Sequence, residues 1–412
     1  MASPTSEHRS GTPWGLVLLL GALTAFGPMS IDMYLPAFPA MATDLGASPN
    51  QVQATLATFF AGMAVGQFFY GPASDRLGRR GPILTGVVLY VAATIACALA
   101  PTVETLTAAR FVQALGGCAG AVVARAVVRD RFNHTETARI LSLLILVMGL
   151  APILAPLLGG WVLVFAGWRA IFWVLAGFGV LVGLWVVFAL PESRSADTAA
   201  HAKTESPFGA YLALLRERRL IGYALAAALN GAVLFTYVSS SPNLVIGTYG
   251  FSPQAFSWIF GLNAVGIIGA SQVNRALLRR HTPDRILGRV SLVSVGAGVL
   301  LMAAAFTGLG GYWTVLPLLF IALASYGLMS GNTMAGALSI DPRRAGSISA
   351  LMGGLSFGAG AVAAWAGGVL HDGTARPMAA VMLLCLIGSS LALYTLAFPR
   401  RPSHGQPSSQ QG

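Results

Sequence analysis

Long apolar runs separated by short polar breaks dominate the hydrophobic pattern of the chain. A helix needs about 20 mostly apolar residues to span the hydrocarbon core of a bilayer. The chain supplies twelve such runs, at residues 14–36, 50–73, 82–100, 103–126, 139–163, 168–190, 220–240, 254–275, 286–307, 313–338, 345–370 and 376–398. The pattern therefore predicts an all-α integral membrane protein with twelve transmembrane helices.

The longest internal break is polar and divides the twelve runs into six and six. It predicts an interdomain linker at residues 191–219, between six-helix bundles at 1–190 and 220–400, with a cytoplasmic tail at 401–412. Two pseudo-symmetric bundles of this kind are typical of transporters whose halves rock around a site near the membrane midplane. A channel needs no such duplication.

The composition excludes an ordinary water-soluble domain. Of the 412 residues, 55% are hydrophobic and 9% are charged, whereas a soluble domain carries about 25% charged residues. The 49 glycines favour close helix packing, because small residues let backbones approach where lipid offers no hydrophobic force for association. Cys97, Cys118 and Cys385 fall inside predicted spans without zinc-type spacing, so they predict neither disulfides nor a metal site.

Basic residues lie almost wholly on one side of the predicted topology. With the first run kept as a membrane span and residues 1–13 inside, 22 of the 25 Lys and Arg residues fall in cytoplasmic segments or at adjoining helix ends. Arg169 and Arg376 fall outside, and Arg110 lies within a span. The positive-inside rule therefore predicts that both termini are cytoplasmic. The net charge of +11 reports topology and indicates no nucleic-acid partner.

The decapeptide GPASDRLGRR forms the predicted break between the second and third spans. Its glycine and proline are expected to end the helix, while its arginines meet the negative helix end and the anionic membrane surface. Its aspartate is expected to cap another helix or to pair with an arginine. A basic turn that only sets topology is the alternative. The candidate residues are Gly71, Pro72, Asp75, Arg76, Gly78, Arg79 and Arg80.

The fifth predicted span, 139–163, carries glycines and prolines on neighbouring turns. Proline removes a backbone hydrogen bond and glycine removes bulk, so the helix is expected to bend, to pack tightly and to serve as a pivot. A kinked packing helix without a role in coupling is the alternative. The candidate residues are Gly149, Pro152, Pro156, Gly159 and Gly160.

Asp32 is the one acidic residue that the predicted topology places inside the membrane region. A central charge there costs at least about 2.5–3.5 kcal/mol unless it is paired, protonated or open to a cavity. Arg110 lies at a similar predicted depth, about 10 Å, and is the expected partner. The competition between burial and a guanidinium can adjust proton affinity, which predicts a proton site. A structural aspartate that caps a helix end beside Pro36 is the alternative.

Several polar and aromatic residues inside the spans are candidates for contact with a substrate in a mostly apolar cavity. Asparagine and glutamine also form hydrogen bonds between membrane helices, so a purely structural role is equally open for each of them. The candidates are Tyr34, Gln113, Asn230, Tyr237, Asn263 and Asn332.

Several of these segments resemble one superfamily of transporters. The decapeptide at 71–80 is similar to the signature loop of the major facilitator superfamily. The segments SIDMYLPAFPAM at 30–41, RFVQALGGCAGAVVARAVVRD at 110–130 and APILAPLLGGWV at 151–162 resemble its Bcr/CflA group, as does GNTMAGAL at 331–338. That group is a branch of the twelve-helix drug/proton antiporters, in which the stretch at 151–162 corresponds to the antiporter motif.

The resemblance implies a monomeric transporter of the bacterial inner membrane. Its expected partners are the lipid bilayer and a small amphipathic substrate, such as bicyclomycin or a phenicol, which it exports in exchange for protons. It implies no cofactor and no enzymatic reaction. Thr24 stands where certain relatives carry a second acid, which puts in doubt a two-proton stoichiometry and efficient export of dicationic drugs.

Two other functions remain open at this stage. One is a dedicated exporter of a single metabolite, such as an antibiotic, a sugar or an amino acid. The other is an intramembrane enzyme, which would need a cluster of catalytic groups inside the spans. All six histidines fall in tails, loops or span ends, which disfavours the enzyme.

Overall fold

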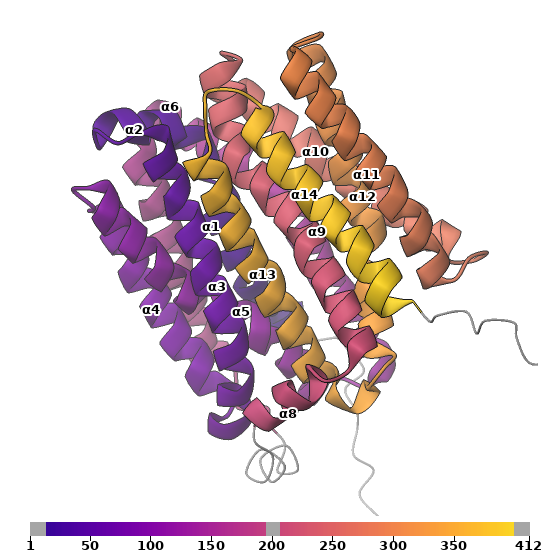
Figure 1. The fold of residues 1–412 in the computed structure, drawn as a ribbon. Coiled ribbons are helices and arrows are strands. Elements are labelled where there is room, and N and C mark those ends of the chain that lie inside the picture. The colour runs from indigo at the N-terminus through magenta and orange to yellow at the C-terminus, as the bar shows by residue number, and fades with distance from the viewer. Residues whose placement is uncertain (1–13, 195–206, 399–412) are drawn as a thin grey trace, which may run out of the picture.

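The computed structural model describes residues 14–194 and 207–398, and over these ranges the chain is almost wholly helical (Figure 1). The long elements are helices arranged side by side as one bundle. The first half holds α1 (Trp14–Asp32), η1 (Leu35–Ala37), α2 (Phe38–Asp44), α3 (Pro49–Leu77), α4 (Arg80–Ala98), α5 (Val103–Arg131) and α6 (His134–Ala189). The second half holds α8 (Pro207–Leu214), α9 (Arg218–Pro242), η2 (Asn243–Thr248), α10 (Pro253–Leu277), α11 (Pro283–Thr307), α12 (Tyr312–Leu338), η3 (Pro342–Arg344), α13 (Ala345–Val369), α14 (Arg376–Ala392) and η4 (Leu393–Ala397).

The helices match the twelve predicted spans. Eleven helical stretches in the described ranges are long and apolar enough to cross a membrane. One of them, α6, has 56 residues and would be about 84 Å long if straight, far more than a bilayer core. Gly167 breaks it with a left-handed backbone (φ 75°, ψ 175°), so α6 supplies two spans that meet at this residue. The prediction of two spans at 139–163 and 168–190 is confirmed.

Two predicted helix ends are wrong. The first run was expected to be helical to residue 36, but α1 ends at Asp32 and a short turn leads into η1. Gly71 and Pro72 were expected to end the second span, but α3 continues through both of them to Leu77. Gly78, with φ 95°, ends that helix instead. A proline inside a helix removes one hydrogen bond, whereas a left-handed backbone stops the helical pattern altogether.

Short polar residues in the breaks start the helices. Ser48 before α3, Thr102 before α5 and Asn133 before α6 each accept a hydrogen bond from the backbone N–H three residues later. In all three cases that third residue returns a bond to the cap, which completes a capping box. These caps satisfy N–H groups that would otherwise lack partners at the membrane surface.

Glycines let the helices approach closely, as the composition predicted. A Cβ on Gly62 of α3 would lie 2.4 Å from the carbonyl oxygen of Phe111 on α5. A Cβ on Gly120 of α5 would lie 2.5 Å from the carbonyl oxygen of Leu23 on α1. Real Cβ atoms do not come this close to other atoms, so these helix contacts depend on the absence of a side chain at Gly62 and Gly120.

Two helix pairs join residues 14–190 to residues 218–398, called here the N-terminal and C-terminal halves. The α13 helix packs along α3, and α10 packs along the first part of α6. Figure 1 shows α3 and α13 side by side near the centre of the bundle. The α3–α4 turn and α8 lie at one end of the bundle, called the basic end, and α2 lies at the opposite end. Any movement of one half against the other must slide or separate these pairs.

Candidate functional site

Asp32 is the last residue of α1 and its side chain is buried, with 4% of the residue exposed. Among the described residues, no hydrogen bond or ion pair holds its carboxylate. It lies within electrostatic range of the hydroxyl of Tyr237 on α9, in the other half. Asp32 therefore sits where the two halves meet, and an unpaired charge there is costly.

Arg110 occupies a separate, fully buried cage in the N-terminal half. Its guanidinium centre lies 4.2 Å from the ring centres of both Tyr34 and Phe59. Its Nη1 donates to Oε1 of Gln113 at 2.6 Å, and its Nη2 donates to the carbonyl oxygen of Ser30 at 2.9 Å. Stacking on aromatic faces and hydrogen bonding stabilise a cation that has no water around it.

The expected ion pair between Asp32 and Arg110 is wrong for this structure. Arg110 takes the Ser30 carbonyl instead, and no ion pair of the described chain joins it to a carboxylate. Helix geometry explains the difference, because residues two apart on a helix point about 200° away from each other. The Ser30 hydroxyl meets Tyr90 of α4 and the Ser30 carbonyl meets Arg110 of α5, so the Asp32 side chain points elsewhere. Similar depth along two helices did not ensure a contact.

The six candidate substrate residues separate into distinct surroundings. Tyr34 and Gln113 belong to the cage of Arg110, where Tyr34 also shares a 3.2 Å hydrogen bond with Thr55. Gln113 donates in turn to Thr94 at 2.8 Å. All four of these side chains are fully buried. Their contacts are those of a packed core in the N-terminal half.

The C-terminal half brings two of the candidates together. Asn263 on α10 donates from Nδ2 to the hydroxyl of Tyr237 at 2.9 Å, beside Asp32. Asn332 instead forms a reciprocal pair with Asn274, at 2.7 and 3.4 Å, that joins α12 to α10. Asn230 is buried, and no residue in the described ranges forms a hydrogen bond with its Nδ2. Of the candidates in the C-terminal half, Tyr237 therefore lies within electrostatic range of Asp32, and Asn263 is hydrogen-bonded to Tyr237.

The glycines of α6 contact both the turn after Asp32 and the opposite half. A Cβ on Gly159 would lie 1.7 Å from the carbonyl oxygen of Met33, so this glycine leaves room for the turn itself. Next to it, a Cβ on Gly160 would lie 3.2 Å from Oγ of Ser257 on α10. That hydroxyl is 2.9 Å from the carbonyl oxygen of Pro156, to which it donates. This part of α6 thus links the break in α1 to the C-terminal half.

The other two residues of the α6 motif, Gly149 and Pro152, lie earlier on the same helix. Gly149 faces the side chain of Ile268 on α10, at 3.4 Å from a Cβ built on the glycine. Pro152 and Pro156 lie inside α6, whose backbone stays helical through both and leaves the helical region only at Gly167. The sharp break of α6 is therefore at a glycine and not at the prolines.

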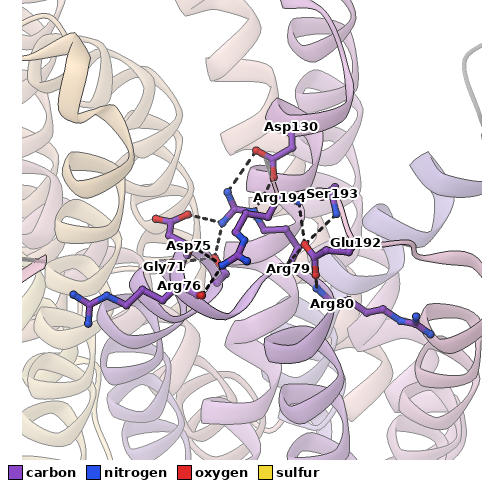
Figure 2. A network of polar contacts seen from close by, with 10 residues as sticks. Gly71, Asp75, Arg76, Arg79, Arg80, Asp130, Glu192, Ser193 and Arg194 are labelled. Atoms are coloured by element: carbon purple, nitrogen blue, oxygen red, sulfur yellow. Dashed lines mark hydrogen bonds and ion pairs between the residues drawn. The ribbon is translucent and has the colours of Figure 1, made fainter. Parts of the chain in front are cut away.

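The decapeptide at 71–80 forms an ordered polar network at the basic end (Figure 2). Arg79 is buried and joins two helix ends, because its Nη1 donates to Asp75 at 2.5 Å and its Nε donates to Asp130 of α5 at 2.7 Å. Its Nη1 also donates to Ser74 at 2.9 Å. The expected pairing of Asp75 with an arginine is present. The network shows more structure than a plain basic turn requires.

Glu192, just after α6, closes the same network and was not among the predicted residues. Its carboxylate accepts the backbone N–H groups of Arg79 at 2.8 Å, Arg80 at 3.2 Å, and Ser193 and Arg194 at 3.0 Å. Figure 2 shows it beside Arg79 and Arg80 of the α3–α4 turn and next to Ser193. Partial burial acts to raise the pKa of Glu192, but these N–H donors outweigh it and hold the pKa below its ordinary 4.5.

Replacing Glu192 by Gln should lower the melting temperature at pH 7 by several degrees, because hydrogen bonds to a charged acceptor are the stronger ones. Since the folded-state pKa is lowered, this stabilisation is present above pH 4.5 and is lost as the pH falls through the folded pKa. Melting of the purified protein from pH 8 to pH 4 should show the difference from wild type narrowing toward acid. Glu217→Gln, at an exposed position without a capping bond, is the matched control. A constant difference across pH would contradict the assignment.

Comparison with known proteins shows the family. The family model of the Major Facilitator Superfamily matches residues 18–364. The chain is 35% identical over 97% of its length to the uncharacterized MFS-type transporter YdgK of Bacillus subtilis, covering 98% of that protein. It is 33% identical over 94% of its length to a bicyclomycin resistance protein homolog of Haemophilus influenzae, again covering 98% of it. The multidrug resistance protein MdtL of Klebsiella pneumoniae is 30% identical over 92% of this chain and 95% of its own.

Solved structures share the fold at much lower identity. A D-xylose-proton symporter superposes with a TM-score of 0.74 at 13% identity, over 93% of this chain and 97% of the symporter. A bacterial homolog of the human lysosomal transporter Spinster, inward-facing and unoccupied, gives a TM-score of 0.72 at 16% identity, over 93% and 96% of the two chains. These likenesses support the helical architecture.

Proposed function

Because this chain belongs to the major facilitator superfamily, we propose that it exports small amphipathic drugs in exchange for protons. The names of its relatives, a bicyclomycin resistance protein homolog and a multidrug resistance protein, support a drug as cargo. Bicyclomycin-like and phenicol compounds are the first candidates. The protein acts as a monomer in a bacterial inner membrane, without a cofactor, and its basic end with both termini faces the cytoplasm.

The observation that carries the proposal is the position of Asp32. It is a buried carboxylate where α1 ends, it has no ion-pair partner among the described residues, and it lies within electrostatic range of Tyr237 in the other half. In this proposal Asp32 takes up a proton when the site faces outward and releases it when the site faces inward. Cargo binds to the deprotonated state, so the two ligands exclude each other and exchange is coupled.

The α6 helix connects this acid to the movement of the halves. Gly159 packs on the turn that follows Asp32, and the neighbouring Pro156 accepts a hydrogen bond from Ser257 of α10. When α10 moves and shifts α6, the contact between Gly159 and Met33 must shift too. Gly159 has no side chain, so the backbones of α6 and of the turn after Asp32 are in direct contact. A change in the exposure or surroundings of Asp32 follows from this movement, as alternating access requires.

Transport driven by a proton gradient tests this proposal. The purified protein in liposomes with an acid interior should accumulate a labelled phenicol or bicyclomycin several-fold above the passive level. Nigericin in potassium buffer, which collapses the pH gradient, should remove that accumulation. Uptake that is the same with and without the pH gradient would contradict proton coupling. A response to one compound in a broad panel would instead favour the dedicated exporter of a single metabolite.

A cluster centred on Gln53 closes the end of the bundle opposite the basic end. The Gln53 side chain is fully buried on α3, and its Nε2 donates to Oγ of Ser240 and to the carbonyl oxygen of Ala364, each at 3.1 Å. Its Oε1 accepts from Asn243 at 3.1 Å. One side chain of the N-terminal half thus binds three segments of the other half. Opening of this end must break all three bonds.

Replacing Gln53 by Leu should shift the protein toward the state that is open at this end. Three lost hydrogen bonds of about 0.5–1.5 kcal/mol each amount to at least about 1.5 kcal/mol, so the ratio of open to closed protein should rise at least tenfold. The readout is the labelling rate of a Gly368→Cys reporter, which lies beside Gln53, by an impermeant maleimide added outside. Gln272→Leu, at an exposed amide, should leave the rate unchanged. Equal labelling with and without Gln53→Leu would show that this cluster does not hold the end closed.

A further inference from the structure

A cavity of about 660 Å³ lies between α10 and α12, apart from the cage of Arg110. Its lining is apolar or aromatic except for one amide, and none of the ten lining residues is charged. One wall opens to the outer surface of the bundle, where Leu262, Trp313 and Ile321 are exposed. In a membrane this surface faces lipid. The volume falls within the range of about 300–1,000 Å³ that is usual for small-molecule sites.

Asn263 supplies the single amide in the lining, and half of its hydrogen-bonding capacity is used. Its Nδ2 donates to the carbonyl oxygen of Ile259 at 3.0 Å and to the hydroxyl of Tyr237 at 2.9 Å. A carbonyl oxygen can only accept a hydrogen bond, so the amide atom of Asn263 that contacts the Ile259 carbonyl must be the nitrogen, and the other amide atom is Oδ1. Within the described chain, nothing donates to Oδ1, although the residue is only 4% exposed. An amide oxygen in apolar surroundings lacks a donor here.

We propose that this cavity binds an uncharged amphipathic molecule that enters from the bilayer and donates one N–H or O–H to Oδ1 of Asn263. The aromatic and aliphatic walls suit a ring-containing body of drug size. A charged molecule would lose its water without gaining an oppositely charged partner, because no lining residue carries charge. The inference rests on the proposed export function only for the role of the bound molecule as cargo.

The site is connected to the acid that we assign to proton transfer. The Tyr237 hydroxyl accepts the hydrogen bond from Asn263 and lies within electrostatic range of Asp32. A donor bound to Oδ1 of Asn263 would polarise the amide and strengthen the bond from Nδ2 to Tyr237. Occupation of the cavity would thereby alter the hydrogen bonding of Tyr237, which lies within electrostatic range of Asp32. A phospholipid acyl chain has no donor for Asn263 and would leave this amide oxygen unsatisfied.

N-phenyl-1-naphthylamine is the probe for the test, because it is neutral, has two aromatic ring systems and carries one N–H. It is titrated into the purified full chain in lipid nanodiscs and excited directly, and empty nanodiscs supply the partition background. Wild type should show a saturable component. Asn263→Leu should weaken it about five- to tenfold, the value of one hydrogen bond. Leu316→Trp, which fills the cavity from α12 and keeps Asn263 in place, should remove it.

Energy transfer from tryptophan locates the bound probe. Trp313→Phe should reduce the transfer most, since Trp313 lines the cavity, whereas Trp365→Phe, at an exposed site on α13 outside the lining, should reduce it less. Unchanged saturable binding in both Asn263→Leu and Leu316→Trp would overturn the proposal and leave the cavity as a place filled by lipid. Probe binding to this cavity needs no pH gradient, so its result is independent of the transport assay. Binding without proton-driven transport would leave this proposal standing and contradict the proposed function, and transport without binding would do the reverse.

Discussion

Replacing Asp32 by Asn should abolish drug uptake driven by a proton gradient while leaving exchange of drug for drug intact. Asparagine keeps the size of the side chain but cannot take up a proton, so no proton competes with cargo for the site. Cargo can therefore still bind and cross, but its movement is no longer coupled to protons. Liposomes with an acid interior should show gradient-driven uptake at less than a tenth of the wild-type rate. Counterflow, in which internal unlabelled drug exchanges for external labelled drug, should persist.

Two further variants separate loss of the proton site from general damage. Asp32→Glu keeps a titratable group and should retain part of the driven uptake. Asp372→Asn changes an exposed acid in the α13–α14 connection and should transport as wild type does. Gradient-driven uptake that survives in Asp32→Asn would place the proton on another residue. Loss of counterflow together with uptake would show that Asp32 is needed for cargo binding itself.

Replacing Gly159 by Ala should both destabilise the protein and reduce transport to less than a tenth. The added Cβ would lie 1.7 Å from the carbonyl oxygen of Met33, so α6 and the turn after Asp32 must move apart. Overpacking of this kind costs about 1–3 kcal/mol, which should lower the melting temperature by several degrees. Thermal melting in detergent and uptake in liposomes measure the two effects.

Gly177→Ala is the matched control for this prediction. It lies on the same helix, and a Cβ there meets no atom within 4 Å. Its melting temperature should stay at or slightly above the wild-type value, because alanine favours helix more than glycine. Normal transport by Gly159→Ala would contradict a tight contact at Met33. A stable but inactive Gly159→Ala protein would support the view that this contact transmits movement to Asp32.

The sequence predicts the helices well because hydrophobic length is a strong and local signal. Each run of about 20 apolar residues needs only its own composition to be identified as a span. Helix ends were less predictable where two signals compete. At 71–78, a Gly-Pro pair and a later glycine both suggest a stop, and only the backbone angle of Gly78 shows which one acts. At Asp32, the helix ends four residues earlier than the apolar run suggested.

The site was predictable as a set of residues but not as a set of contacts. Asp32 stands out because an acid in a span is rare, and Arg110 for the same reason. The directions in which their side chains point depend on how far each helix is rotated about its own axis, and the composition of the chain does not determine this rotation. Glu192 was missed because its partners are backbone N–H groups, which every residue carries. The one available signal was that Glu192 is an acidic residue directly after a predicted span.

Direct measurement of proton movement tests the central claim most sharply. Inverted membrane vesicles are energised to an acid interior, and a phenicol or a bicyclomycin-like compound is then added while internal pH is followed by fluorescence. Antiport predicts a rise in internal pH with at least one compound in wild-type vesicles and none in Asp32→Asn vesicles containing equal amounts of protein. Transport of labelled compound without any pH change, or a pH change that persists in Asp32→Asn, would contradict proton exchange through Asp32.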